Sequence, residues 1–214
     1  MNKTPKQAGL LAITLLLAGC AAGPSSQDVA EATQKVLKSS FRDQGIAKTD
    51  WLDQDASNRA CSEAQGAALD DKLAKSIEEA NFKTVKMPSD GKFIGDWKEG
   101  EKIAQNGRGM TWTDAAGSPN GGSCYNCHQI SKEELSFGSI GPSLYNYGKL
   151  RGVADPASAA SKPIVDYTWG KLWNAKGYNA CSGMPRFGHA GILSESQLRD
   201  VMALLLDPQS PVNK

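Results

Sequence analysis

Cys124-Tyr125-Asn126-Cys127-His128 is the stretch of sequence that decides how this chain folds. Two thiols three residues apart can form thioethers with the two vinyl groups of a haem, and the next imidazole can turn to its iron. A thioredoxin-like Cys-x-x-Cys would need a βαβ context, and a zinc site would need a second ligand pair. Neither accompanies the motif, so it predicts one covalently bound haem c.

A haem that only transfers electrons needs a second axial ligand besides His128. The candidates are the other histidine and the four methionines that remain once residues 1–19 are removed: His189, Met87, Met110, Met184 and Met202. Met202 falls on the apolar face of a predicted helix, and Met87 lies in an N-terminal extension. Met184 stands in a loop-forming stretch, and a thioether ligand suits a high-potential site. We therefore predict Met184 as the ligand, with His189 and Met110 as alternatives.

The loop 138–144 follows the motif and contains Gly141-Pro142. A ligating histidine usually donates its other ring N–H to an oxygen acceptor, which fixes its tautomer. Because proline restricts its own φ, the Pro142 carbonyl is the predicted acceptor, the alternative being an ordinary turn. An apolar stripe with helical spacing is expected to line the haem: Tyr167, Trp169, Leu172 and Trp173. No catalytic residue is predicted.

The N-terminus predicts export from the cytoplasm. Lys3 and Lys6 precede a short apolar run, so residues 1–19 are typical of a signal peptide and too short to span a membrane. Leu17-Ala18-Gly19-Cys20 resembles the lipobox of bacterial lipoproteins, which would make Cys20 a lipid anchor. Ordinary cleavage near Ala21 or Ala22 is the alternative. Residues 20–27 are expected to form a tether, and the protein to lie in the periplasm.

The remaining cysteines are Cys61 and Cys181. In an oxidising compartment two such cysteines pair more often than they stay free, so we predict a disulfide between them. Two buried thiols that never meet are the alternative.

Composition is that of a globular chain, with 214 residues, 40% apolar and 22% charged. Loss of residues 1–19 removes Lys3 and Lys6 and leaves a net charge of about −1. Bulk charge therefore argues against nucleic-acid binding.

Helical periodicity with no sustained strand alternation predicts an all-α fold. Stretches 28–41 and 61–80 form the expected helices of an extension over residues 28–93. A turn near Pro88 precedes a second domain, residues 94–214. Its first helix begins after Asp96 as N-cap, and its last helix follows a capping box that starts at Ser194.

Several of these motifs together resemble a class I cytochrome c domain over residues 94–207: the first helix, the Cys124 to His128 motif, the Gly141-Pro142 loop, Met184-Pro185 and the last helix. The resemblance implies that fold, preceded here by an N-terminal helical extension. Residues 106–123 depart from the family pattern, because they are inserted between the first helix and the first haem cysteine.

More narrowly, the sequences around Cys124, Ser139 to Leu144, Tyr147-Gly148, Asn179 to Ser182 and Met184 to Gly188 resemble the SoxX family. These proteins are the monohaem subunits of periplasmic SoxAX complexes in thiosulfate oxidation. The resemblance implies a SoxA-like haem partner, a SoxYZ-like carrier protein met through the complex, and an acceptor cytochrome c. The chain would be the non-catalytic, electron-accepting subunit of an L-cysteine S-thiosulfotransferase.

Two other functions remain open on the sequence alone. The chain could be a free-standing periplasmic electron shuttle of the same fold. It could also be a haem sensor or enzyme whose sixth ligand is displaceable.

Overall fold

The computed structural model describes residues 23–134 and 137–214. Over these ranges it consists of helices, turns and loops, and an isolated bridge between Gln44 and Ala47 is the one β-type pairing. The predicted all-α class is confirmed for this part of the chain. The predicted signal peptide, residues 1–19, and the predicted lipid anchor Cys20 lie outside the described residues.

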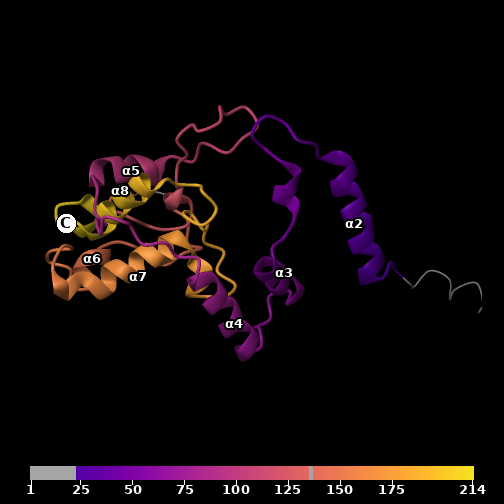
Figure 1. The fold of residues 1–214 in the computed structure, drawn as a ribbon, viewed down its shortest axis with the longest axis horizontal. Helices are drawn as coiled ribbons and strands as arrows, with labels where there is room; N and C mark the ends of the chain where they lie inside the picture. The colour runs from indigo at the N-terminus through magenta and orange to yellow at the C-terminus, as the bar shows by residue number, and fades with distance from the viewer. Residues whose placement is uncertain (1–22, 135–136) are drawn as a thin grey trace, which may run out of the picture. The chain divides into compact units, whose positions relative to one another are not determined.

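The α-helices are α2 (Ser26–Ser40), α3 (Ala56–Glu63), α4 (Asp71–Phe82), α5 (Trp97–Gln105), α6 (Tyr147–Leu150), α7 (Lys162–Trp173) and α8 (Glu195–Leu206) (Figure 1). Short 3₁₀ turns connect them: η2 (Thr49–Leu52), η3 (Cys124–Asn126), η4 (Ala159–Ser161), η5 (Ala175–Gly177) and η6 (Pro211–Asn213). Both predicted caps are present. The Asp96 carboxylate accepts a bond from Lys98 N, and Ser194 with Gln197 forms a capping box before α8.

The chain divides into two compact units, residues 1–43 and residues 44–214. Helix α2 belongs to the first unit, and none of its residues is buried. Helices α3 to α8 belong to the second unit. The predicted extension, residues 28–93, is therefore shared: its first part lies in the first unit, and residues 44–93 belong to the same compact unit as the predicted haem domain.

The prediction of one helix over residues 61–80 is wrong. Helix α3 ends at Glu63, and Gln65 and Gly66 then take left-handed conformations with φ of 49° and 87°. Such a conformation interrupts helical hydrogen bonding. Helix α4 starts anew after Asp70, whose carboxylate accepts bonds from Lys72 N and Leu73 N. The prediction failed because the helical spacing of apolar residues continues through residues 64–70, where the backbone leaves the helical conformation.

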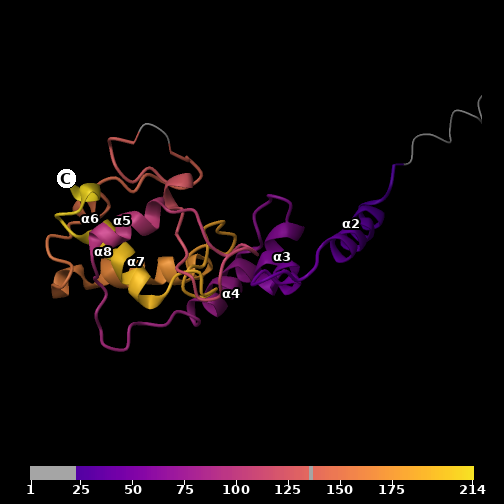
Figure 2. The same cartoon turned by 90° about the horizontal axis from the view of Figure 1, so that it is seen from above.

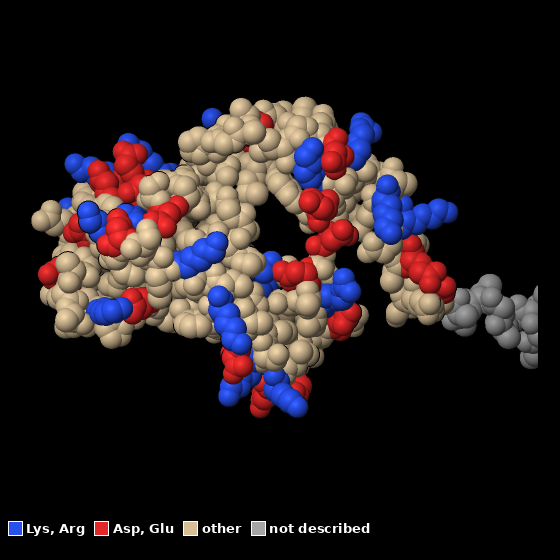
Figure 3. All heavy atoms as spheres, in the orientation of Figure 1, with Lys and Arg blue, Asp and Glu red and all other residues tan. Residues whose placement is uncertain are grey.

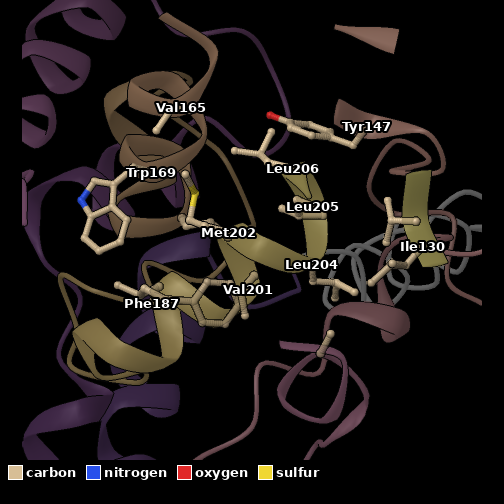
Figure 4. Packing of buried hydrophobic residues seen from close by; sticks show 14 of the residues in the cluster. Ile130, Tyr147, Val165, Trp169, Phe187, Val201, Met202, Leu204, Leu205 and Leu206 are labelled. Carbon is tan, nitrogen blue, oxygen red and sulfur yellow. The ribbon is translucent and has the colours of Figure 1, made fainter. Parts of the chain in front are cut away.

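Helix α8 is the centre of the second unit, because its C-terminal half, residues 201–206, is apolar on all sides. Seven of its residues are buried: Leu198, Val201, Met202, Ala203, Leu204, Leu205 and Leu206. Met202 is fully buried and extends toward Val165 and Trp169 of α7 (Figure 4), which confirms its predicted place in the core.

Helix α5 lies beside α8 in both ribbon views (Figures 1 and 2). The two helices approach closely at Gly100, where a Cβ atom would come within 2.1 Å of the Asp200 carbonyl oxygen. Glycine is required at this contact because any side chain would separate the helices. The pair brings the end of α5 to the segment that leads into the Cys124 motif.

Candidate functional site

The Cys124 to His128 segment forms a tight turn built on η3. Ser123 takes a left-handed conformation before it, and the backbone N–H groups of Cys127 and His128 both donate to the Cys124 carbonyl, at 3.1 and 2.9 Å. Gly122 N donates to Ile103 O of α5 at 2.8 Å. The turn is therefore attached to the end of α5, although residues 106–123 intervene in sequence.

The loop 137–144 folds over this turn through backbone hydrogen bonds. Gly138 N donates to Tyr125 O at 3.1 Å, and Gly141 N donates to Cys127 O at 2.8 Å. A Cβ atom on Gly138 would lie 1.7 Å from Asn126 O, and one on Gly141 would lie 2.1 Å from His128 Cε1. Both glycines are needed for the loop to approach the turn this closely.

The imidazole of His128 is oriented by this loop. Its Nδ1 atom lies 2.6 Å from the Pro142 carbonyl oxygen, so the predicted contact is present. A carbonyl oxygen can only accept, so Nδ1 carries the hydrogen. The neutral ring then has its lone pair on Nε2, which is the nitrogen that remains available to bind a metal.

The two cysteines of the turn, Cys124 and Cys127, are unpaired and partly buried. Burial raises the pKa of the Cys124 thiol to about 12. Cys61 and Cys181, in contrast, form a disulfide with an S–S distance of 2.07 Å, which confirms the predicted pairing. The chain thus contains a disulfide and, separately, two adjacent thiols that do not close on each other.

Met184 is partly buried and packs against the same hydrophobic cluster as Cys124. Its backbone N–H donates to Ser182 Oγ at 3.3 Å. His189 is exposed at the surface, where partial burial of its ring, together with nearby Arg186, lowers its pKa. Met110 is partly buried and has a left-handed backbone with φ of 62°. Of these three candidates, Met184 is the one packed against the core cluster.

The predicted apolar stripe, residues 167–173, is only partly buried. Trp169 and Leu172 are in the core, whereas Tyr167 is 42% exposed and packs edge-on against Tyr178 at a centroid distance of 5.0 Å. Within the described residues the buried Trp173 Nε1 has no hydrogen-bond partner. From the sequence, Trp173 is expected only to line the haem as an apolar residue. Its donor was missed there, although every indole ring has an N–H group that can donate a hydrogen bond.

No family model matches this sequence. A curated protein of Aquifex aeolicus (strain VF5), described as an uncharacterized lipoprotein, is 33% identical over 215 residues. The match covers 96% of this chain and 98% of the relative. The chain belongs to this lipoprotein family. The relative's description agrees with the lipobox predicted here, although Cys20 itself lies outside the residues that the structure describes.

Two surface hollows of this family member lie away from the Cys124 turn. Their volumes are about 500 and 340 Å³. Each is lined by residues from both stretches 152–157 and 207–209, and neither is lined by the turn. In the described ranges no group of three or more His, Cys, Asp or Glu residues could hold a metal ion. Nor does any described helix have the length and apolarity to cross a membrane.

Charges of both signs are interspersed on the face of this family member shown in Figure 3. Lys102 pairs with Glu99 at 2.6 Å, and Arg199 pairs with Asp90 at 2.7 Å. This pattern agrees with the near-zero net charge of the sequence.

Proposed function

We propose that this family member is a monohaem c-type cytochrome that transfers single electrons. Cys124 and Cys127 would bind the haem through thioethers, and His128 would ligate its iron through Nε2. The observation that carries the proposal is the hydrogen bond from His128 Nδ1 to Pro142 O, because it leaves Nε2 free beside two unpaired thiols. When bound, the haem supplies an iron that cycles between two oxidation states by one electron.

The residues around the turn fit such a group. Cys124 and Cys127 are not bonded to each other, whereas the other two described cysteines form a disulfide, as expected of thiols reserved for thioethers. Trp173, which packs against the same hydrophobic cluster as Cys124, adds a buried N–H donor without an acceptor. A haem carries carboxylate oxygens, which are acceptors of the kind this donor lacks.

Met184 is the proposed sixth ligand, within a class I cytochrome c fold. Its position against the core cluster that also contacts Cys124 supports this choice over the exposed His189. An iron with two protein ligands has no open position for substrate. The chain would therefore pass electrons without carrying out substrate chemistry.

The finer proposal is a SoxX-like subunit of a SoxAX-type complex. It rests on the sequence resemblance around Cys124, Gly141-Pro142 and Met184. The chain would accept electrons released when a SoxA-like partner joins thiosulfate to a cysteine of a SoxYZ-like carrier, and would pass them to an acceptor cytochrome c. A lipid at Cys20 would hold it at a membrane outside the cytoplasm, as the relative's description as a lipoprotein supports.

The direct experiment is expression of the full chain, with its signal, in a host that has a c-type cytochrome maturation system. We expect a protein that keeps its haem after denaturation, and loss of this covalent haem in Cys124→Ser/Cys127→Ser. The matched control is Cys61→Ser/Cys181→Ser, which removes the other cysteine pair and should retain the haem. Absence of covalent haem from the wild-type chain would refute the proposal.

A second experiment addresses the Sox assignment. Purification of the tagged native protein from thiosulfate-oxidising cells should recover a second haem protein. A purified chain that is isolated alone, and whose haem is not reduced when thiosulfate, carrier and cell extract are added together, would favour a free-standing shuttle.

A further inference from the structure

Helices α3 and α4 contact the segment that contains Met184, although they lie about a hundred residues earlier in the chain. We propose that this helix pair, residues 55–82, is a clamp that positions Met184 for ligation. The inference rests on the proposed function, because it concerns the proposed sixth ligand. For clarity we call residues 178–188 the ligand loop.

The first attachment is covalent. Cys61, in α3, is bonded to Cys181, which lies three residues before Met184. Three residues of extended chain reach about 10 Å, so the disulfide limits the positions that the Met184 backbone can occupy. The sequence separation of 120 residues shows that the bond joins distant parts of the fold.

The second attachment is ionic and lies on the other side of Met184. Arg186 Nη2 lies 2.6 Å from Asp55 Oδ2, and the Arg186 side chain is only 18% exposed. Asp55 is also the N-cap of α3, because its other carboxylate oxygen accepts a bond from Asn58 N at 2.8 Å. Helix α3 therefore holds the ligand loop both three residues before Met184 and two residues after it.

Helix α4 and the turn η5 support the same segment through buried and partly buried polar contacts. Glu78 Oε1 accepts a bond from Ala180 N at 3.1 Å. Asn174 donates to Asn81 Oδ1 at 3.0 Å, and both asparagines are buried. Lys176, nearly buried, donates to the Ala180 carbonyl at 3.0 Å. The backbone before and at the start of the ligand loop thus has few alternative conformations that keep these groups satisfied.

Preorganisation is the physical reason for a clamp. A thioether is neutral and competes with any other ligand that can reach the iron. A mobile loop would lose conformational entropy each time Met184 bound, whereas a loop held in place has already lost it on folding. The clamp therefore favours Met184 over external ligands.

The test uses the mature, full-length holoprotein and imidazole as the competing ligand. The near-infrared Met-to-iron charge-transfer band reports displacement of Met184. We expect Cys61→Ser/Cys181→Ser to bind imidazole about tenfold more tightly than the wild type, since the loop is no longer preorganised. Asp55→Asn should shift the affinity in the same direction by about threefold, because asparagine keeps the N-cap while the ion pair is lost.

One control separates the clamp from general destabilisation. Val212→Ala removes buried volume from the core and should lower stability without changing imidazole affinity. If Cys61→Ser/Cys181→Ser does not fold, Asp55→Asn alone decides the question. Wild-type affinity in the clamp variants, with the band present, would overturn the clamp and leave the haem proposal standing. A wild-type holoprotein without the band would overturn the Met184 assignment itself, and the clamp inference with it.

Discussion

His128 Nδ1 lies 2.6 Å from the carbonyl oxygen of Pro142, 14 residues further along the chain. The contact exists because Gly141 lets the loop backbone pass directly over the imidazole ring. One hydrogen bond therefore fixes both the direction in which the ring faces and the nitrogen that carries its proton. The proposed metal ligand is thus prepared by the fold itself.

The steric role of Gly141 can be tested by substitution with alanine. A methyl group there would lie 2.1 Å from His128 Cε1, so Gly141→Ala must displace the loop or the ring. We expect a loss of about 1–3 kcal/mol in the free energy of unfolding, measured with urea. Gly183→Ala is the control, because a Cβ atom at Gly183 would have no other atom within 4 Å, and its cost should stay within about 0.5 kcal/mol. An equal loss of stability in the two variants would contradict the steric role assigned to Gly141.

The His128 tautomer gives a spectroscopic prediction. Because the Pro142 carbonyl accepts from Nδ1, NMR of ¹⁵N-labelled holoprotein should show a proton on Nδ1 that exchanges slowly with solvent. Nε2 should carry no proton. A proton on Nε2 would rule out its proposed bond to iron.

Met184 and Met202 should respond in opposite ways to alanine substitution. Met202 is fully buried beside Trp169, so Met202→Ala should cost about 2–5 kcal/mol of stability and keep the Met-to-iron band. Met184 is only partly buried, so Met184→Ala should remove the band at a smaller cost. The near-infrared spectrum and urea unfolding of both variants check this. Loss of the band in Met202→Ala alone would reverse the ligand assignment.

The Asp55–Arg186 ion pair predicts a pH effect on stability. Burial opposes ionisation of the Asp55 carboxyl, but the Asn58 N–H bond and Arg186 outweigh it and lower its pKa below the ordinary value of 3.8. As the pH falls, the Asp55 carboxyl is therefore protonated in the unfolded chain at a higher pH than in the folded protein. The stabilisation is therefore present above about pH 4 and is lost as the pH falls through the lowered folded pKa.

Urea unfolding at pH 7 and at pH 3 measures this contribution. Asp55→Asn should be less stable than the wild type by less than about 1 kcal/mol at pH 7, because the pair is partly exposed. The difference should shrink at pH 3. A difference that grows toward low pH would have the wrong sign for an ion pair.

Several local features of the fold could be predicted without the structure. The N-caps at Asp96 and Ser194, the buried Met202 and the Pro142 contact depend on neighbouring residues or on a marked apolar period. The disulfide followed from the number of cysteines and the expected compartment. The local features are readable because each signal and its consequence lie close together in the chain, whereas the disulfide, across 120 residues, needed only a count of cysteines.

Other features depended on contacts that no local pattern encodes. The break at Gln65-Gly66 interrupts a stretch whose apolar spacing is continuous, because backbone conformation overrides periodicity there. The Asp55–Arg186 pair and the Glu78–Ala180 bond join residues more than a hundred positions apart. Such pairs form only when the whole unit has packed. No pattern in the sequence identifies which two distant residues will meet, so these contacts could not be predicted.

The sequence by itself therefore predicted the type of cofactor site proposed here, through the spacing of Cys124, Cys127 and His128. The tertiary structure alone decided how residues 44–93 relate to that site: it joined them to the same compact unit, bonded α3 to both sides of Met184, and bonded α4 to the backbone before it. The physical reason is the distance along the chain that separates the residues in each kind of interaction. Thioether and imidazole chemistry needs residues a few positions apart, whereas a clamp needs distant side chains brought together by a shared core.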